Sequence, residues 1–155
     1  MQKINIVCVG NIKEKYFIDA ISEYAKRISR FASISIIEVE ECLSSSKTSI
    51  EQIKITECER LKKHLEGYCV AMDKGGRELD SEGLATLIDS KFAAGAKVIT
   101  FIIGGSNGLT KEFVSGCDMV LSFGKITYPH QLMRVVLTEQ IYRAETILNH
   151  ITYHK

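Results

Sequence analysis

Lys97–Ile103 reads KVITFII and leads directly into Gly104-Gly105-Ser106-Asn107-Gly108, which is the pattern of a buried strand followed by a glycine-rich loop. A second apolar run, Met119–Ser122, opens in the same way into a loop of small residues that ends at Pro129. In α/β proteins, ligand crevices form where parallel strands end in loops of this kind. The last third of the chain therefore predicts a binding site.

Strand-like and helix-like segments alternate along the whole chain. The expected strands are Lys3–Val9, Ser33–Val39, Tyr68–Met72, Lys97–Ile103 and Met119–Ser122. The expected helices are Phe17–Ile28, Ile50–Glu66, one capped by Ser81 and stopped by Gly95, a short one from Thr110 to Val114, and one from Pro129 to about Leu148. This order predicts one α/β domain over residues 1–155, with a mostly parallel sheet and helices on both faces. Pattern alone favours an ordinary doubly wound fold, because knots are nearly absent among proteins.

Composition narrows the class of protein. The 155 residues carry a net charge of +1, so a nucleic-acid partner would have to be met by a local patch of cations. Apolar runs are far shorter than a membrane helix needs, and the N-terminus lacks the features of a signal peptide, so we expect a cytoplasmic protein with no membrane partner. The five cysteines contain no C-x-x-C pair, which favours buried free thiols over a disulfide or zinc framework.

The glycine loops do not match the common nucleotide motifs. A dinucleotide site needs G-x-G-x-x-G after the first strand, whereas Gly104–Gly108 follows the fourth expected strand. Gly124–Thr127 resembles the end of a P-loop but lacks the upstream glycine, because position 119 is Met. Three strand-end loops remain, Met72–Gly76, Gly104–Gly108 and Phe123–Tyr128. They either hold an adenine and ribose or only satisfy tight turns. The Ser-rich segment Leu43–Ser49 is read as a solvated connection, with ordering on binding as the alternative.

Several motifs together resemble a known family. They are Val9-Gly10, MDKGG at Met72–Gly76, GGSNGL at Gly104–Leu109, LSFGKITYPHQLMR at Leu121–Arg134, EQIYRA at Glu139–Ala144 and the terminal NH…YH. In this order and over nearly the whole chain, they resemble SPOUT methyltransferases of the RlmH type. The resemblance implies an α/β fold with a C-terminal deep trefoil knot that binds S-adenosylmethionine. It also implies a homodimer that methylates N3 of a pseudouridine in helix 69 of 23S ribosomal RNA, on assembled ribosomes. A non-catalytic nucleotide-binding or ribosome-associated module with this fold is the alternative.

Carried over by motif, the resemblance places the cofactor contacts in the three strand-end loops. These residues are Met72, Gly104, Phe123, Gly124, Lys125, Ile126, Thr127 and Tyr128. Met72 stands where the family usually has Leu. The tail Asn149–His154 is one residue longer than the common form and lacks its proline.

Candidate residues for the chemistry lie on the last helix and in the tail. His130 and Arg134 share a helix face at i, i+4, next to the loop Phe123–Tyr128. Arg134 is expected to hold an RNA phosphate or to favour the deprotonated acceptor, with a structural ion pair as the alternative. By resemblance, Tyr153 and His154 lie near the target base in the partner subunit's site. Arg143, expected on the same side as Arg134, is a further RNA contact.

Lys155 completes the expected RNA-binding set. His150 and His154 have the spacing of a metal pair, but no carboxylate or cysteine lies near them in sequence, so we expect no metal. Apolar residues of the last helix occupy more than one stripe, which favours a dimer that buries it.

Overall fold

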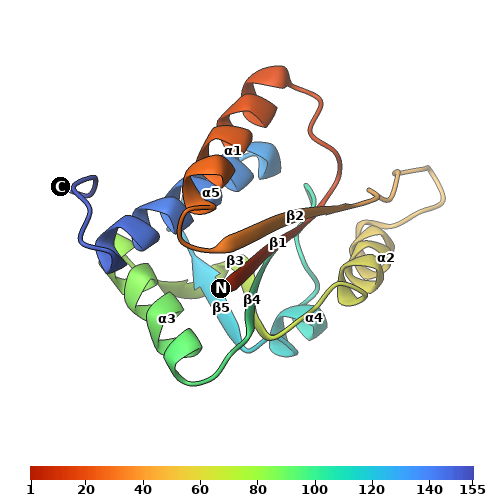
Figure 1. The fold of residues 1–155 in the computed structure, drawn as a ribbon. Coiled ribbons are helices and arrows are strands. Elements are labelled where there is room, and N and C mark those ends of the chain that lie inside the picture. The colour runs from red at the N-terminus through yellow and green to blue at the C-terminus, as the bar shows by residue number, and fades with distance from the viewer.

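Five parallel strands form one sheet in the order β2-β1-β4-β3-β5 (Figure 1). The computed structural model describes residues 1–155. The strands are β1 (Lys3–Val9), β2 (Ser33–Val39), β3 (Tyr68–Glu78), β4 (Val98–Ile103) and β5 (Met119–Ser122). The helices are α1 (Lys15–Ile28), α2 (Ile50–Lys62), α3 (Ser81–Ala93), α4 (Lys111–Ser115) and α5 (His130–Leu148). The predicted α/β class and parallel sheet are confirmed.

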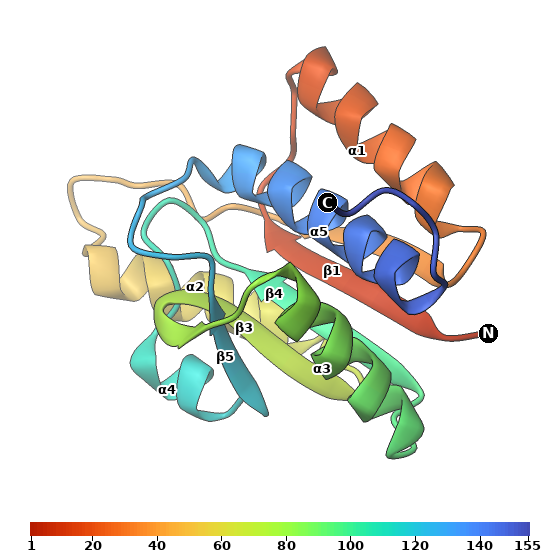
Figure 2. The same cartoon turned by 90° about the vertical axis from the view of Figure 1, so that its left-hand side faces the viewer.

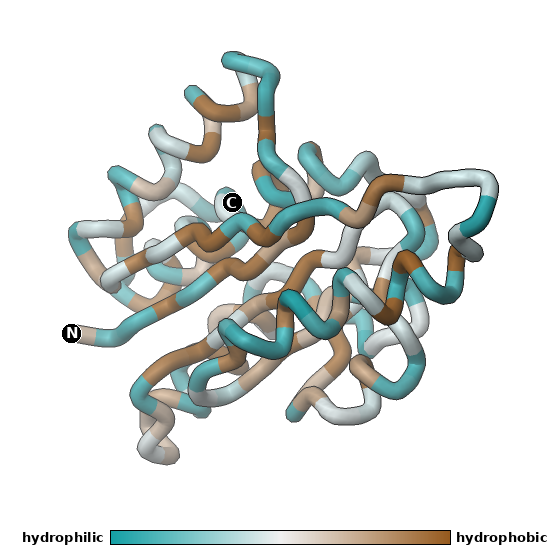
Figure 3. Tube along the Cα trace, turned by 90° about the vertical axis from the view of Figure 1, so that its right-hand side faces the viewer, coloured by the Kyte–Doolittle hydropathy of each residue, from teal (hydrophilic) through white to brown (hydrophobic).

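Helices cover both faces of the sheet, as predicted. The larger core joins alternate residues of β1 and β4, such as Ile4 and Phe101, to α1, α3 and α5. The intervening residues, such as Val7 and Ile102, pack with α2 and α4 on the opposite face. Figure 2 shows α1, α5 and α3 along one side of the sheet. In Figure 3 hydrophobic colour predominates along the central strands, whereas hydrophobic and hydrophilic segments alternate along the helices. Alternate residues of the central strands thus pack on opposite faces of the sheet, as expected for strands buried on both faces.

β3 is longer than predicted. Its ladder with β5 continues to Glu78, with a register shift in which Met72 and Arg77 both lie opposite Leu121. The predicted turn at Asp73–Gly76 is therefore an irregularity inside a strand rather than its end. Gly76 fits there because a Cβ would lie 2.7 Å from the carbonyl carbon of Val120. The glycines mark a bulge, which composition does not distinguish from a turn.

Three helix ends differ from the predicted ones. Asp80, not Ser81, caps α3, because its carboxylate accepts from the Gly83 N–H at 2.7 Å, while the Ser81 hydroxyl donates to Gln140 Oε1. α2 ends at Lys62 rather than Glu66, and Pro129 precedes the first residue of α5. The predicted cap Thr110 is confirmed, since its Oγ1 accepts from the Phe113 N–H at 3.1 Å.

α5 lies between α1 and α3, and each of its residues is buried or partly buried within the single chain (Figure 2). The apolar surplus of this helix therefore has an intrachain explanation and does not by itself indicate a dimer. None of the helices combines the length and apolarity that a membrane span requires. All five cysteines are free thiols, and burial raises the pKa of Cys8 to about 12.

Candidate active site

A pocket of about 340 Å³ opens between the irregular stretch of β3, the loops that follow β4 and β5, and the first turn of α5. Because the strands are parallel, these loops meet at one edge of the sheet. Its lining comprises Met72, Asp73, Lys74, Ile103–Gly108, Leu121–Gly124, Ile126–Tyr128, His130 and Met133. The volume falls within the range of small-molecule sites. The three segments singled out in the sequence as strand-end loops thus form one pocket, although the first of them lies within β3.

Most of the predicted cofactor residues line this pocket. Met72, Gly104, Phe123, Gly124, Ile126, Thr127 and Tyr128 all contribute to the lining. Lys125 is exposed and does not line it. The side chain of Ile126 is 71% exposed, so the pocket mouth carries an apolar wall open to solvent.

The glycines of the pocket loops are required by local geometry. Gly108 and Gly124 have φ of +81° and +102°, a backbone conformation that favours glycine. A Cβ on Gly104 would lie 2.9 Å from the carbonyl carbon of Gly108 and 3.1 Å from the Leu109 side chain. These glycines therefore satisfy tight turns, and the same glycines also line the pocket.

The pocket contains polar side chains that the sequence did not single out. Lys74 Nζ, on the irregular part of β3, bonds Thr127 Oγ1 and thereby joins two of the loops. Asp73, Ser106 and Asn107 also line the pocket. Their only signal in the sequence was their position beside the glycines of each loop.

His130 is the predicted catalytic residue that the structure places in the pocket. Burial lowers the pKa of its imidazole, and the nearby Arg134 guanidinium lowers it further, while Glu41 and Glu14 act in the opposite direction. The imidazole is therefore largely neutral near pH 7 and has a nitrogen free to accept a proton. It is a chemically suitable base at the edge of the pocket.

Arg134 has a structural role instead of the predicted RNA contact. Its side chain is 2% exposed, and its guanidinium lies 2.6 Å from Glu38 Oε2. The same group donates to the carbonyl oxygens of Val9 and Gly10 at 2.8 and 2.6 Å. These bonds tie α5 to the ends of β1 and β2. A guanidinium buried in this way does not reach an RNA phosphate, so the ion-pair alternative is the correct one.

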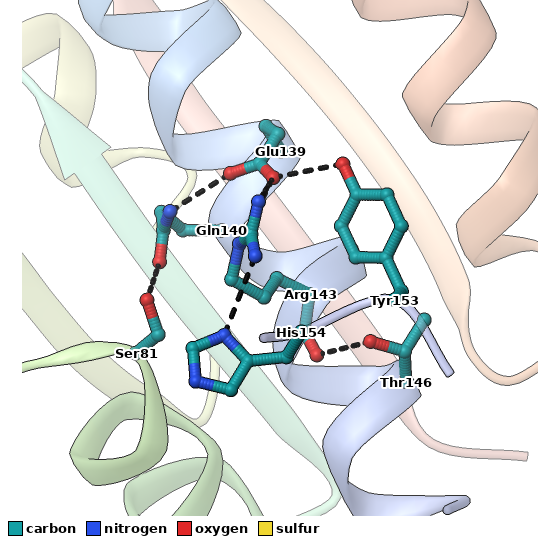
Figure 4. Close-up of polar contacts among 7 residues, drawn as sticks. All are labelled: Ser81, Glu139, Gln140, Arg143, Thr146, Tyr153 and His154. Atoms are coloured by element: carbon teal, nitrogen blue, oxygen red, sulfur yellow. Dashed lines mark hydrogen bonds and ion pairs between the residues drawn. The ribbon is translucent and has the colours of Figure 1, made fainter. Parts of the chain in front are cut away.

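Arg143 lies on the opposite side of α5 from Arg134, because nine residues correspond to two and a half helical turns. The expectation that both face the same side is therefore wrong. Arg143 lies 2.6 Å from Glu139 Oε1 and is 3.3 Å from His154 Nδ1 (Figure 4). Its guanidinium carbon is 4.7 Å from the centroid of the Tyr153 ring.

The C-terminal tail folds onto its own helix (Figure 4). Tyr153 donates its phenolic O–H to Glu139 Oε1 at 2.9 Å. Burial, followed by this hydrogen bond, raises the pKa of Tyr153 to about 12, so the phenol is protonated. Lys155, the last residue, is exposed.

Within one chain the tail does not join the pocket. His130 and Arg143 are separated by about 20 Å along α5, from the rise per residue of a helix. Tyr153 and His154 contact the Arg143 end of that helix, whereas the pocket lies at the His130 end. The predicted catalytic residues thus form two groups in the single chain.

Comparison with known proteins extends this description. Residues 2–154 match a family model described as "Predicted SPOUT methyltransferase". The ribosomal RNA large subunit methyltransferase H of Bifidobacterium animalis subsp. lactis is 48% identical, over 98% of this chain and 99% of its own. The protein of the same name from Caldicellulosiruptor saccharolyticus is 44% identical, over 98% and 99% of the two chains.

Solved structures share the fold at low sequence identity. A "Probable Methyltransferase" from Bordetella pertussis has a TM-score of 0.59 and 11% identity, covering 93% of this chain and 96% of its own. A candidate methyltransferase from Legionella pneumophila, in complex with bound SAM, has a TM-score of 0.52 and 12% identity, covering 92% and 66%. The family match spans the sheet, the pocket loops and α5 together, and the chain belongs to the SPOUT methyltransferase family.

Proposed function

We propose that this protein transfers a methyl group from S-adenosylmethionine to N3 of a pseudouridine in helix 69 of 23S ribosomal RNA, on assembled ribosomes. The observation that carries the proposal is the pocket: its lining is built from the same loops whose motifs resemble the RlmH-type enzymes. The names of the full-length relatives, at 44 and 48% identity, support a ribosomal RNA substrate.

The pocket suits the cofactor. Met72, Ile126 and Met133 offer apolar surface for an adenine ring, and the glycine loops expose backbone N–H and C=O groups near it. These backbone groups would orient the adenine and ribose. When bound, S-adenosylmethionine supplies an electrophilic methyl group on a sulfonium sulfur.

The residues of the chain act on the acceptor. The N3–H of a pseudouridine must lose its proton for nitrogen to attack the methyl carbon, and a positioned base promotes that loss. His130 lines the pocket and its pKa is lowered, so its neutral imidazole is the base we propose. Arg134 acts on the chemistry only by fixing the start of α5, on which His130 lies.

A homodimer would bring the two groups of predicted residues together. The tail lies about 20 Å from the pocket of its own chain, by the helix-rise argument, so it completes that chain's site only by a large movement. In a two-fold dimer the tail of one subunit can instead face the pocket of the other. We place Tyr153 and His154 at the acceptor side of the partner's pocket.

We also propose that the C-terminal part of the chain is knotted. β5 pairs with β3 at the edge of the sheet, yet α5, which follows it, packs between α1 and α3. The segment that joins β5 to α5 passes the irregular part of β3, where Lys74 bonds Thr127. Threading of the chain at this crossing would produce the trefoil knot that the resemblance implies.

Arg143 and Lys155 are the cations we assign to RNA. With a net charge of +1, binding must depend on a few local contacts. Both residues lie at the tail end of α5, so they would approach the acceptor side together with Tyr153 and His154.

The decisive experiment measures N3 methylation of the helix 69 pseudouridine by mass spectrometry in cells that lack this protein. We expect the methyl group to be absent, to return with the wild-type gene, and to stay strongly reduced with His130→Ala. Unchanged methylation in the deletion strain would contradict the proposal and favour a non-catalytic module.

A further inference from the structure

A buried carboxylate supports the glycine loop from behind. Glu57, on α2, is 2% exposed and does not line the pocket. An ideal Cβ built on Gly105 would lie 2.8 Å from Glu57 Oε1 and 3.3 Å from its carboxyl carbon. The carboxyl group therefore lies against the backbone of Gly105, a residue that does line the pocket. There is no room between them for a side chain or a water molecule.

Only one of the two carboxylate oxygens of Glu57 has a hydrogen-bond partner. Glu57 Oε2 accepts from the Cys42 N–H at 3.1 Å, whereas Oε1 has no hydrogen-bond partner. An unsatisfied buried oxygen is costly, so its retention at this position calls for an explanation. Burial is the largest of the causes that raise the pKa of this carboxyl group.

The next residue holds the other end of the loop. Cys58 Sγ lies 3.5 Å from the Thr110 N–H and 3.8 Å from its hydroxyl. Glu57 contacts the loop near its beginning and Cys58 contacts it just past its end. Two adjacent residues of α2 therefore contact the glycine loop, one near its beginning and one just past its end.

We propose that Glu57 is a positioning residue for the cofactor, which presses the glycine loop Gly104–Gly108 into the conformation that receives S-adenosylmethionine. This inference rests on the proposed cofactor. Through its bond to Cys42 the same carboxylate ties the start of the segment Cys42–Ser49 to the loop.

The test is the dissociation constant for S-adenosylmethionine, measured by calorimetry on the full-length protein well below its melting temperature. Glu57→Ala should weaken binding about tenfold or more, because small displacements of a binding loop are costly. Glu57→Gln keeps the shape and the acceptor for Cys42, and should recover most of the affinity. Glu59→Gln, on the exposed side of the same helix, is the matched control and should bind like wild type.

A double-mutant cycle separates positioning from general destabilisation. Gly105→Ala introduces the Cβ that would meet Oε1, so it should weaken binding in the wild-type background. In the Glu57→Ala background the same change should cost markedly less, because the carboxylate is gone. Equal fold-losses in the two backgrounds would overturn the proposal. So would wild-type affinity in a folded Glu57→Ala protein.

If Glu57→Ala does not fold, Glu57→Asp takes its place in each comparison, since it keeps the charge and withdraws it by one methylene. Because binding rather than methyl transfer is measured, the outcome is independent of the RNA substrate. A wild-type protein that binds S-adenosylmethionine but leaves helix 69 unmethylated would refute the proposed function and leave the role of Glu57 open to this same test.

Discussion

Replacing Arg134 with alanine should destabilise the fold rather than remove an RNA contact. The guanidinium makes three charge-assisted hydrogen bonds, to Glu38 Oε2 and to the carbonyls of Val9 and Gly10. Removing it leaves two carbonyl groups without their donor at the end of β1. It also leaves Glu38, 37% exposed at its side chain, without its partner.

The magnitude follows from these partners. Breaking a buried ion pair by removing one member costs roughly 3–5 kcal/mol. Water can reach Glu38 in the mutant, which moves the expected loss toward the lower end, about 3 kcal/mol. Arg134→Lys should recover part of this, since one ammonium group keeps the charge but does not reach all three oxygens with fork geometry.

The assay is urea unfolding of the two variants and wild type at one protein concentration, followed by ribosome binding of the folded fraction. Fixing the concentration matters because stability of an oligomer depends on it. An Arg134→Ala protein with unchanged stability and lost ribosome binding would refute the structural role. It would return this residue to the RNA-binding set.

Further predictions address other parts of the molecule. Burial, and secondarily Asp89, raises the pKa of Glu145, so its charge opposes folding and stability falls as pH rises above the ordinary value of 4.5. Glu145→Gln should therefore unfold at higher temperature than wild type at pH 7, with a difference that shrinks toward pH 4.5. Gly104→Val should lose S-adenosylmethionine binding while remaining folded, as circular dichroism and calorimetry would show; undiminished affinity would mean that the pocket is misplaced. Arg143→Ala should reduce the salt dependence of ribosome binding by about one unit of slope, and an unchanged slope would make it structural. A chain ending at Leu148 should bind S-adenosylmethionine and transfer no methyl group, yet regain activity in mixed dimers with Gly104→Val; inactive verified mixed dimers would place each site within one chain.

Local pattern was sufficient for the framework of the fold. Lys3–Val9, Ser33–Val39 and Met119–Ser122 have the predicted bounds, because each is a short run rich in apolar residues, a pattern that depends only on local sequence. The cap at Thr110 was predicted because capping depends on residues within one helical turn. The pocket was predicted from the small-residue loops that follow β4 and β5 and from the glycine-containing stretch of β3.

The ordered motifs indicated a protein family, which hydrophobic periodicity alone does not. The family match over residues 2–154 agrees with the resemblance read from the loops and from α5. Periodicity alone favoured an ordinary doubly wound fold. It carries no information about how a chain is threaded, since threading depends on the path of whole segments and not on their faces.

Only the tertiary structure decided the partners of long polar side chains. Arg134 finds Glu38 ninety-six residues away, and Glu57 lies against a glycine on another strand's loop. Sequence spacing places such residues on a helix face but does not say which loop that face meets. It did not show that β3 continues through its glycines, because the ladder to β5 that defines the strand is a long-range contact. The sequence by itself therefore determined the elements and the pocket loops, whose causes are local, while packing between distant segments determined which charges are structural and which remain free for a ligand.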